Sequence, residues 1–249
     1  MVRYRALIAV VMAVLASAAP GLAQWSLDAE SGVAWSGYND VRIPGDGGTL
    51  FSLSRELRAG SRAFVRLRLS WQFHPRHTLS VLYAPLGFRS AGALDRDIVF
   101  AGGTFPAGRP LRGTYVFNSY RLTYRYSLVR KPRLEAGLGL TVKVRDALIR
   151  LEDELAGGGA EKTDLGVVPL INFRVLWRVG GSWGLLFDGD ALAAPQGRAE
   201  DVSLSLWTDL SRALRLRVGY RLLEGGAEND EVYTFALVNY AFAGLTLTF

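Results

Sequence analysis

The sequence holds few side chains of the kinds that perform nucleophilic, acid–base or metal chemistry. Among 249 residues there are two histidines and no cysteine. The histidines flank one short segment, His74-Pro75-Arg76-His77, and two imidazoles alone do not complete a zinc site. We therefore interpret this segment as a polar turn. The absence of cysteine excludes a disulfide framework, a thiolate metal site and a cysteine nucleophile.

Carboxylates are more numerous, and many fall in segments rich in Gly, Pro and other turn residues. Paired carboxylates can perform acid–base catalysis or hold calcium, but their spacing here matches no calcium loop. The glycine run from Gly157 to Gly159 lacks the Lys and the Ser or Thr of a phosphate-binding loop. The sequence therefore predicts no catalytic residue, no metal ligand and no cofactor.

Most other charged residues lie in segments of regular alternation, of which Arg62 to Phe73 is the clearest. There Leu67 and Leu69 alternate with Arg66 and Arg68. Successive side chains of a strand point to opposite faces, so this segment predicts a strand with one apolar face and one charged face. After residue 23, no stretch has a sustained helical period or the length of an apolar transmembrane helix.

The same pattern predicts about ten strands, whose connections alternate between short turns and longer loops. Short turns therefore gather at one end of the assembly and long loops at the other. Two of the loops hold further strand patterns, Thr49 to Leu57 and Asp97 to Phe105, and counting both gives twelve strands. Eight strands is the other alternative. The ten ranges are 25–38, 62–73, 77–87, 113–129, 133–149, 166–178, 182–193, 200–210, 213–224 and 231–249.

One face of the expected strands is apolar and the other carries both signs of charge. In a soluble β-barrel the apolar face packs inward, whereas in a membrane barrel it meets lipid and the lumen is polar. Strands of ten residues or more suit the roughly 9 to 11 tilted residues that cross a bilayer. The aromatic residues near the ends of the apolar face predict an interfacial girdle: Trp71, Phe73, Tyr124, Tyr126, Trp177 and Trp183. The sequence thus favours the membrane barrel.

The N-terminus predicts export. Two arginines precede an apolar run from Ala6 to Ala16, and small residues follow it, which is the pattern of a secretory signal peptide cleaved after Ala23. The run is shorter than the roughly 20 residues that span a bilayer as a helix. We therefore divide the chain into a signal peptide at residues 1–23 and one barrel domain at residues 24–249. Export makes a nucleic-acid partner unexpected.

With this leader, the alternating strands and the C-terminal Leu245-Thr246-Leu247-Thr248-Phe249, the chain resembles the outer-membrane β-barrel proteins of Gram-negative bacteria. The resemblance spans the mature chain and identifies no subfamily. It implies an all-β, transmembrane, antiparallel up-and-down barrel with periplasmic termini, short periplasmic turns and long extracellular loops. It also implies an outer-membrane location, lipid and lipopolysaccharide as partners, and recognition of Leu245, Leu247 and Phe249 by the barrel assembly machinery.

The charged face then lines the lumen, and its residues are the main functional candidates. In a narrow barrel they form an internal network of ion pairs, which is the interpretation we favour; the alternative is an anion-selective passage, since rings of Arg or Lys set such selectivity. The basic candidates are Arg66, Arg68, Arg121, Arg125, Lys143, Arg145, Arg174, Arg178, Arg215, Arg217 and Arg221. The acidic candidates are Glu135, Asp188, Asp190 and Asp209, with Asp28 and Glu30 near the start.

The functional expectation is a non-enzymatic outer-membrane barrel that acts as a narrow channel or transporter for small, anionic solutes. An enzyme similar to the known outer-membrane proteases or deacylases would need a histidine near the external rim, and the two histidines here fall in a periplasmic turn. Two alternatives stay open. One is a structural or surface-interaction barrel whose external loops bind a partner or lipopolysaccharide, and the other is a soluble periplasmic lipid-binding β-barrel.

Overall fold

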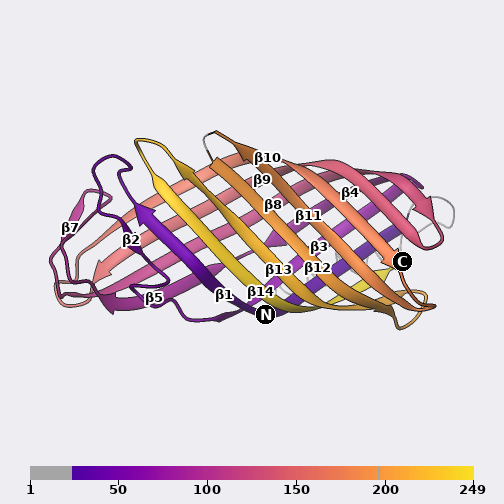
Figure 1. The fold of residues 1–249 in the computed structure, drawn as a ribbon, viewed down its shortest axis with the longest axis horizontal. Helices are drawn as coiled ribbons and strands as arrows, with labels where there is room; N and C mark the ends of the chain where they lie inside the picture. Colours follow the sequence, from indigo (N-terminus) through magenta and orange to yellow (C-terminus); the bar gives the residue numbers. More distant parts are fainter. Residues whose placement is uncertain (1–23, 196) are drawn as a thin grey trace, which may run out of the picture.

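The structure, a computed structural model, describes residues 24–195 and 197–249, so the expected signal peptide lies outside the described residues. Antiparallel strands wind into one closed barrel (Figure 1). The strands of its wall are β1 (Gln24–Arg42), β3 (Arg62–His74), β4 (His77–Ala84), β5 (Gly87–Ala93), β8 (Pro110–Lys131), β9 (Leu134–Asp153), β10 (Gly159–Arg178), β11 (Trp183–Ala194), β12 (Gly197–Asp209), β13 (Leu214–Glu228) and β14 (Tyr233–Thr248).

The wall has ten strand positions because β4 and β5 share one of them. Both pair with β8, and Pro85 lies in the break between them, where no ladder hydrogen bond is required of it. The barrel closes where β14 pairs with β1, in a register that runs from Ser26 opposite Thr248 to Arg42 opposite Tyr233. These pairings confirm the antiparallel barrel of ten strands expected from the sequence.

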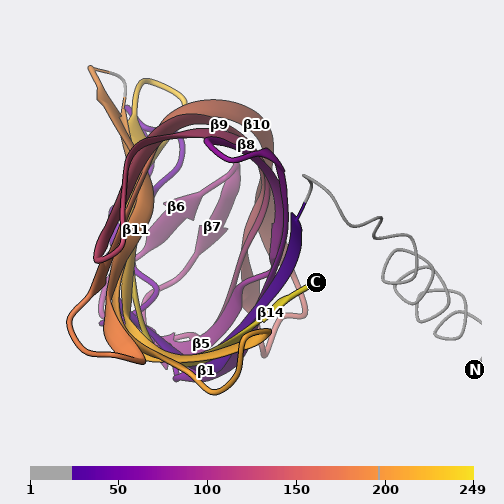
Figure 2. The same ribbon diagram turned by 90° about the vertical axis from the view of Figure 1, so that its right-hand side faces the viewer.

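The longer loops fold over the external end of the barrel. They contain β2 (Phe51–Ser52), β6 (Ile98–Phe100) and β7 (Gly103–Phe105), which lie outside the ten positions of the wall, so the twelve-strand alternative is wrong. In a view along the barrel, β6 and β7 lie across the bore (Figure 2). We call this cap the dome. Its buried apolar core consists of Val41, Ile43, Phe51, Leu53, Leu57, Leu94, Ile98, Phe100, Phe105, Leu111, Ile149 and Leu151.

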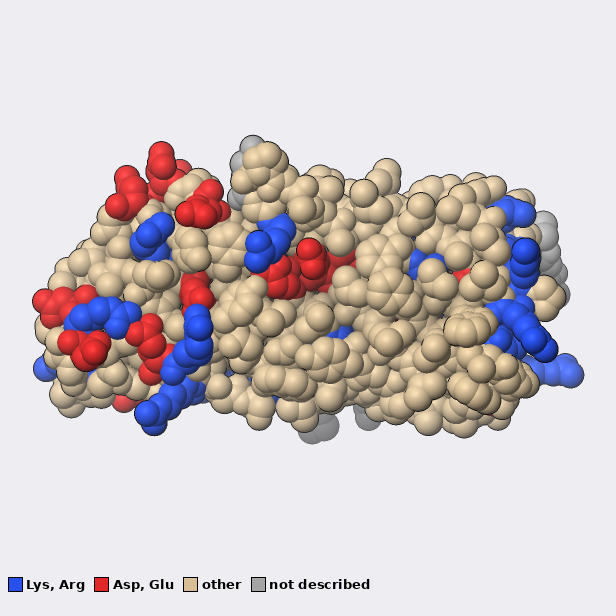
Figure 3. Space-filling view, in the orientation of Figure 1, with Lys and Arg blue, Asp and Glu red and all other residues tan. Residues whose placement is uncertain are grey.

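Burial along the wall is inverted relative to a soluble barrel. Leu140 and Val142 point outward and are 68% and 49% exposed, whereas Arg66 and Arg121 point inward and are each 4% exposed. On the face shown in Figure 3, charged side chains gather over the external half and at the periplasmic end, and the band between them is mostly uncharged. An apolar exterior around a charged interior is the pattern of a transmembrane barrel. The soluble alternative, which needs an apolar interior and a polar exterior, is therefore not supported.

Three residues that depart from an ideal membrane strand have local explanations. Asn118 lies on the outward face and donates to Asp146 at 3.0 Å, in the part of the wall above the apolar band. Asn239 accepts from the hydroxyl of Tyr220 at 2.6 Å. Pro169 lies in β10 where the register with β9 runs without a shift and no described strand pairs on the other side, so its missing amide hydrogen breaks no ladder. No helix among the described residues is long and apolar enough to cross a membrane.

Candidate functional site

A layer of ion pairs closes the middle of the barrel. At its centre is Asp201 of β12, which is 1% exposed. Its Oδ2 accepts from Arg66 at 2.9 Å and from Arg121 at 2.5 Å, and its Oδ1 accepts from Arg221 at 2.6 Å. These arginines come from β3, β8 and β13, so one carboxylate joins three other strands of the wall. We call the layer of Asp201, its arginines and the carboxylates described next the septum.

Two further carboxylates complete the septum. Glu30 accepts from Arg221 at 2.9 Å and from Arg217 at 3.0 Å, and Arg217 also donates to Asp28 at 2.6 Å. Because Glu30 and Asp201 each meet several guanidiniums and Asp28 meets that of Arg217, the buried charges are largely compensated within the layer. A charge buried in this way is tolerated only with such partners.

Asp190 anchors the septum to the neighbouring strands. Its Oδ2 accepts from Arg121 at 2.7 Å. Its Oδ1 accepts from the hydroxyl of Thr141 at 2.6 Å and from the amide of Asn172 at 2.9 Å. The carboxylate therefore has a partner on each oxygen, and its position is determined by β8, β9 and β10 together.

Asp201 is the charged residue of the septum that is absent from the predicted lumenal residues, and the polar Thr141 and Asn172 described above are absent as well. The predicted strand at 200–210 includes Asp201, and it has the same parity as Asp209, which is among the predicted lumenal residues. Alternate residues of a strand point to the same face, so this spacing was the signal that Asp201 faces the lumen. The neighbouring Glu200 is exposed on the outer face.

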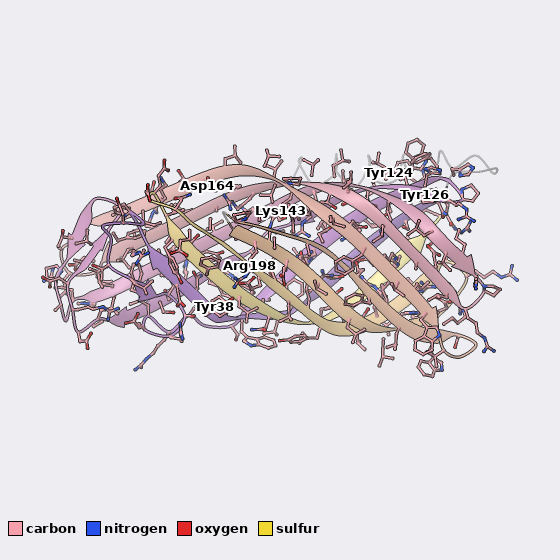
Figure 4. The ribbon with its side chains drawn as sticks, turned by 45° about the horizontal axis from the view of Figure 1, so that its top comes forward. Tyr38, Tyr124, Tyr126, Lys143, Asp164 and Arg198 are labelled. Carbon is pink, nitrogen blue, oxygen red and sulfur yellow. The ribbon has the colours of Figure 1, made fainter. Side chains whose placement is uncertain are left out.

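Above the septum lies a cavity of about 290 Å³, which we call the external cavity. Lys143 of β9 lines it, is 3% exposed, and holds its ammonium 4.6 Å from the centre of the Phe117 ring. Within the described part of the chain, Lys143 makes no ion pair at 4.0 Å or less. Figure 4 places it in the external half of the barrel, together with Tyr38, Asp164 and Arg198. It is the buried cation that a ligand in this cavity would meet.

The other charges around the external cavity are paired. Arg198 donates to both oxygens of Glu224 at 2.8 Å, and the hydroxyl of Tyr38 donates to Glu224 at 2.5 Å. Arg145, a predicted lumenal residue, pairs with Asp164. The rim of the cavity is thus neutral as a set, which leaves Lys143 as its uncompensated charge among the described residues.

Below the septum lies a second cavity of about 140 Å³, which we call the periplasmic cavity. Arg68, Arg125 and Arg174 line it, and in residues 24–195 and 197–249 none of the three has a carboxylate within 4.0 Å. Glu135 and Asp188 are also in its lining, and Asp188 accepts from the hydroxyl of Ser203 at 2.6 Å. Basic side chains therefore exceed acidic ones around this cavity once the septum pairs are set aside.

The remaining lumenal candidates surround Trp207 at the periplasmic end. The guanidiniums of Arg215 and Arg178 lie 4.1 and 4.6 Å from the centre of its indole ring. Asp209 accepts from Arg215 at 2.7 Å and from Arg178 at 3.0 Å. This group shares no ion pair with the septum among the described residues.

The predicted aromatic girdle residues lie near the periplasmic turns. Trp71 packs against Phe73 with ring centres 5.2 Å apart, and Tyr124 bonds to His77 at 2.7 Å. Five of the girdle residues are exposed and Tyr126 is half-buried; the exposed ones are Trp71, Phe73, Tyr124, Trp177 and Trp183. The C-terminal Phe249 exchanges two backbone hydrogen bonds of 2.9 Å with Trp25 at the β1–β14 seam. Leu245 and Leu247 of β14 point outward beside it.

No protein-family model matches the sequence, and no curated protein matches it. Among solved structures, the outer membrane protease OmpT from Escherichia coli is similar at a TM-score of 0.53 and 12% identity, covering 91% of this chain and 97% of that one. Neisserial surface protein A is similar at a TM-score of 0.37 and 12% identity, covering 90% and 97%. Ail of Yersinia pestis is similar at 0.36 and 10%, covering 90% and 99%. At 12% identity the likeness to OmpT shows the fold alone, which is that of an outer-membrane β-barrel.

Proposed function

We propose that this chain, whose fold is that of the Gram-negative outer-membrane β-barrels, binds small anionic solutes in its lumen and admits them past a closed septum, without acting as an enzyme. The observation that carries the proposal is the distribution of unpaired charge. Lys143 above the septum, and Arg68, Arg125 and Arg174 below it, have no ion-pair partner among the described residues. Two carboxylates below the septum, Glu135 and Asp188, have none either, so the unpaired charge is positive by one on each side. Cationic groups without partners on both sides of a barrier favour anions.

The septum argues for gated passage in place of an open pore. Asp201, Asp190 and Arg221 are each 2% exposed or less, so the layer leaves no water-filled bore at rest. A solute that crosses must therefore displace or rearrange ion pairs. This makes the barrel a binding protein or a narrow transporter, and it disfavours a passive porin.

Planar-bilayer recordings test this proposal. The unmodified barrel should show no stable conductance. The charge-balanced double variant Arg121→Ser/Asp190→Ser removes one septum pair and should produce a small conductance with a reversal potential that indicates anion selectivity. A large resting conductance would refute the closed septum, and cation selectivity in the opened variant would refute the anionic solute. Arg174→Gln in the opened background should reduce the selectivity.

A second candidate function is surface interaction, and the folded dome favours it. The external loops bury a core of their own and so present a fixed surface instead of a flexible one. Its ligand would be lipopolysaccharide or a protein partner. Replacing residues 95–109 by a short glycine linker should abolish adhesion or envelope integrity if this is the function, while a heat-modifiable folded barrel still forms.

The outer membrane, its lipids and the barrel assembly machinery are the proposed location and partners. Support comes from the apolar exterior and from the C-terminal strand, in which Leu245 and Leu247 face outward and Phe249 ends the seam. Phe249→Ala should slow assembly in cells while a barrel refolded in detergent remains stable. Equal assembly rates for the two chains would contradict the role of Phe249 as a recognition signal.

A further inference from the structure

The barrel wall has a window on one side. β10 pairs with β9 from Gly159 to Trp177, but it pairs with β11 only from Ile171 to Arg178. In the described chain, the upper part of β10 therefore has a strand on one side only. The exposure of its outward residues reflects this: Leu165 and Val167 are 75% and 68% exposed, whereas Ile171 is 49% exposed.

The other interruption of the wall, beside β5, is covered. There the carbonyl of Leu57 in the dome accepts from the amide of Ala91 at 2.6 Å. The edge of β10 has no comparable cover among the described residues. Instead, the hairpin of β11 and β12 turns outward from the wall next to it (Figure 2). The window is bounded below by the pairing of Ile171 with Ala191, and above by the Lys162–Glu231 ion pair of 3.8 Å.

The external cavity reaches this window. Its lining includes Thr163 and Val168 on β10, on one side of the window, and Ala199 of the β11–β12 hairpin, on the other. From above the cavity is covered by Ile43, a member of the dome core, and by Val232, which packs against that core. The septum lies below. A ligand therefore reaches Lys143 most directly from the side.

The lower part of the window lies at the depth of the outer leaflet. The outward face of β10 is apolar from Trp177 up to Leu165. At about 3.3 Å per residue and a tilt of about 40°, Ile171 lies about 15 Å above Trp177, past the middle of an apolar band about 25 Å tall. Backbone polar groups at that depth are not left facing lipid. The unpaired edge of β10 above Ile171 therefore requires a polar environment, which the cavity would supply.

We propose that the external cavity takes the anionic headgroup of an outer-leaflet amphiphile, whose apolar chains leave through the window between β10 and the β11–β12 hairpin. This proposal rests on the anion binding proposed above, and it identifies the bound anion as the headgroup of an amphiphile. Lys143 supplies the charge that the headgroup needs, and Val168 and Ala199 supply an apolar passage for the chains. Pairing of a foreign strand with the β10 edge is disfavoured because Pro169 has no amide hydrogen to offer there.

Site-specific photo-crosslinking tests the proposal. The full mature barrel carries a photoreactive residue at Ala199, beside the window, or at Ala147, which lines the same cavity from a strand paired on both sides. Each protein is placed in phosphatidylcholine vesicles with a minor fraction of labelled phosphatidic acid or labelled diacylglycerol. We expect Ala199 to capture phosphatidic acid, and to do so more than Ala147. Diacylglycerol, which lacks the charge, should be captured weakly.

Lys143→Gln should lower capture of phosphatidic acid at Ala199 about tenfold, while Lys143→Arg retains it, as expected for a charge-assisted bond. The proposal would be overturned if both lipids were captured equally, or if Ala199 and Ala147 captured lipid equally. Cross-linking to a second copy of the chain would also overturn it. Calorimetry with inorganic phosphate distinguishes failure of the lipid proposal from failure of the anion-binding function. Phosphate binding that depends on Lys143, without lipid capture at Ala199, would retain the anion-binding function and reject entry from the side. Every variant is first checked for heat-modifiable mobility.

Discussion

Arg121 and Asp201 meet across the bore, with Nη2 of the arginine 2.5 Å from Oδ2 of the aspartate. Their strands, β8 and β12, are separated in the wall by three others, so the pair ties together parts of the barrel that share no backbone hydrogen bond. Asp201→Asn would leave its arginines without their shared carboxylate. We expect a loss of about 3 to 5 kcal/mol in the free energy of unfolding, because one partner of a buried pair is removed. Urea titration followed by heat-modifiable mobility measures it.

The matched control is Asp209→Asn at the periplasmic end. Asp209 also meets two arginines, but its side chain is 26% exposed, against 2% for Asp201. Exposed pairs of this kind contribute about 0 to 1 kcal/mol. Equal losses for the two variants would contradict a special role of the septum in stability.

Acid should loosen the dome at Asp153. This carboxylate accepts from Arg109 at 2.8 and 3.2 Å and from the amides of Ala156 and Leu155, and these bonds lower its pKa to about 2. Because the folded pKa lies below the ordinary value of 3.8, the stabilisation is present above that value and is lost as the pH falls through about 2. Hydrogen exchange of the loop amides, corrected for intrinsic rates, should show the loss in this window.

Asp153→Asn should remove this acid-induced loss of protection, which we call the pH step. It should also lower the protection of these amides at neutral pH. The control is Glu154→Gln, which removes the neighbouring pair with Arg112 and should keep the step. If the step persists in Asp153→Asn, another group is responsible for it.

Two equally exposed leucines test the placement of the membrane. Leu140 on β9 is 68% exposed and Leu155 in an external loop is 70% exposed. Leu140→Arg should cost about 2 to 4 kcal/mol in a bilayer, because it places a charge near the centre of the apolar band. Leu155→Arg should change stability by less than about 0.5 kcal/mol. Unfolding in urea from lipid vesicles measures both, and a similar cost for both would contradict the proposed depth.

The barrel could be predicted from the sequence because its signal is local. Alternation with a period of two marks each strand, and a charged face opposite an apolar one, as at Arg66 and Leu67, is repeated in strand after strand. The dome could not be predicted in the same way. The segments at 49–57 and 97–105 carry strand patterns, but they bury their apolar residues against one another, which depends on contacts between distant loops.

The sequence was enough to predict which residues of the site face inward. It was not enough to predict which of them pair with one another. Parity places Arg121 and Arg125 on the same face of β8, yet one joins the septum and the other faces the periplasmic cavity. The difference arises from height in the barrel and from carboxylates on non-neighbouring strands. The window beside β10 is also invisible in the sequence, because it results from an absent pairing and not from any residue pattern.

Trp207 should be the main apolar support of the periplasmic end. It is 2% exposed, lies under the guanidiniums of Arg178 and Arg215, and donates its indole N–H to the carbonyl of Leu185 at 3.1 Å. Trp207→Ala should reduce the free energy of unfolding by about 3 to 5 kcal/mol, since it leaves a cavity that the two arginines cannot fill. Trp207→Phe keeps most of the ring and should lose only about 1 kcal/mol with the hydrogen bond. Urea unfolding compares the two, and equal losses would show that the hydrogen bond, not packing, is the larger contribution.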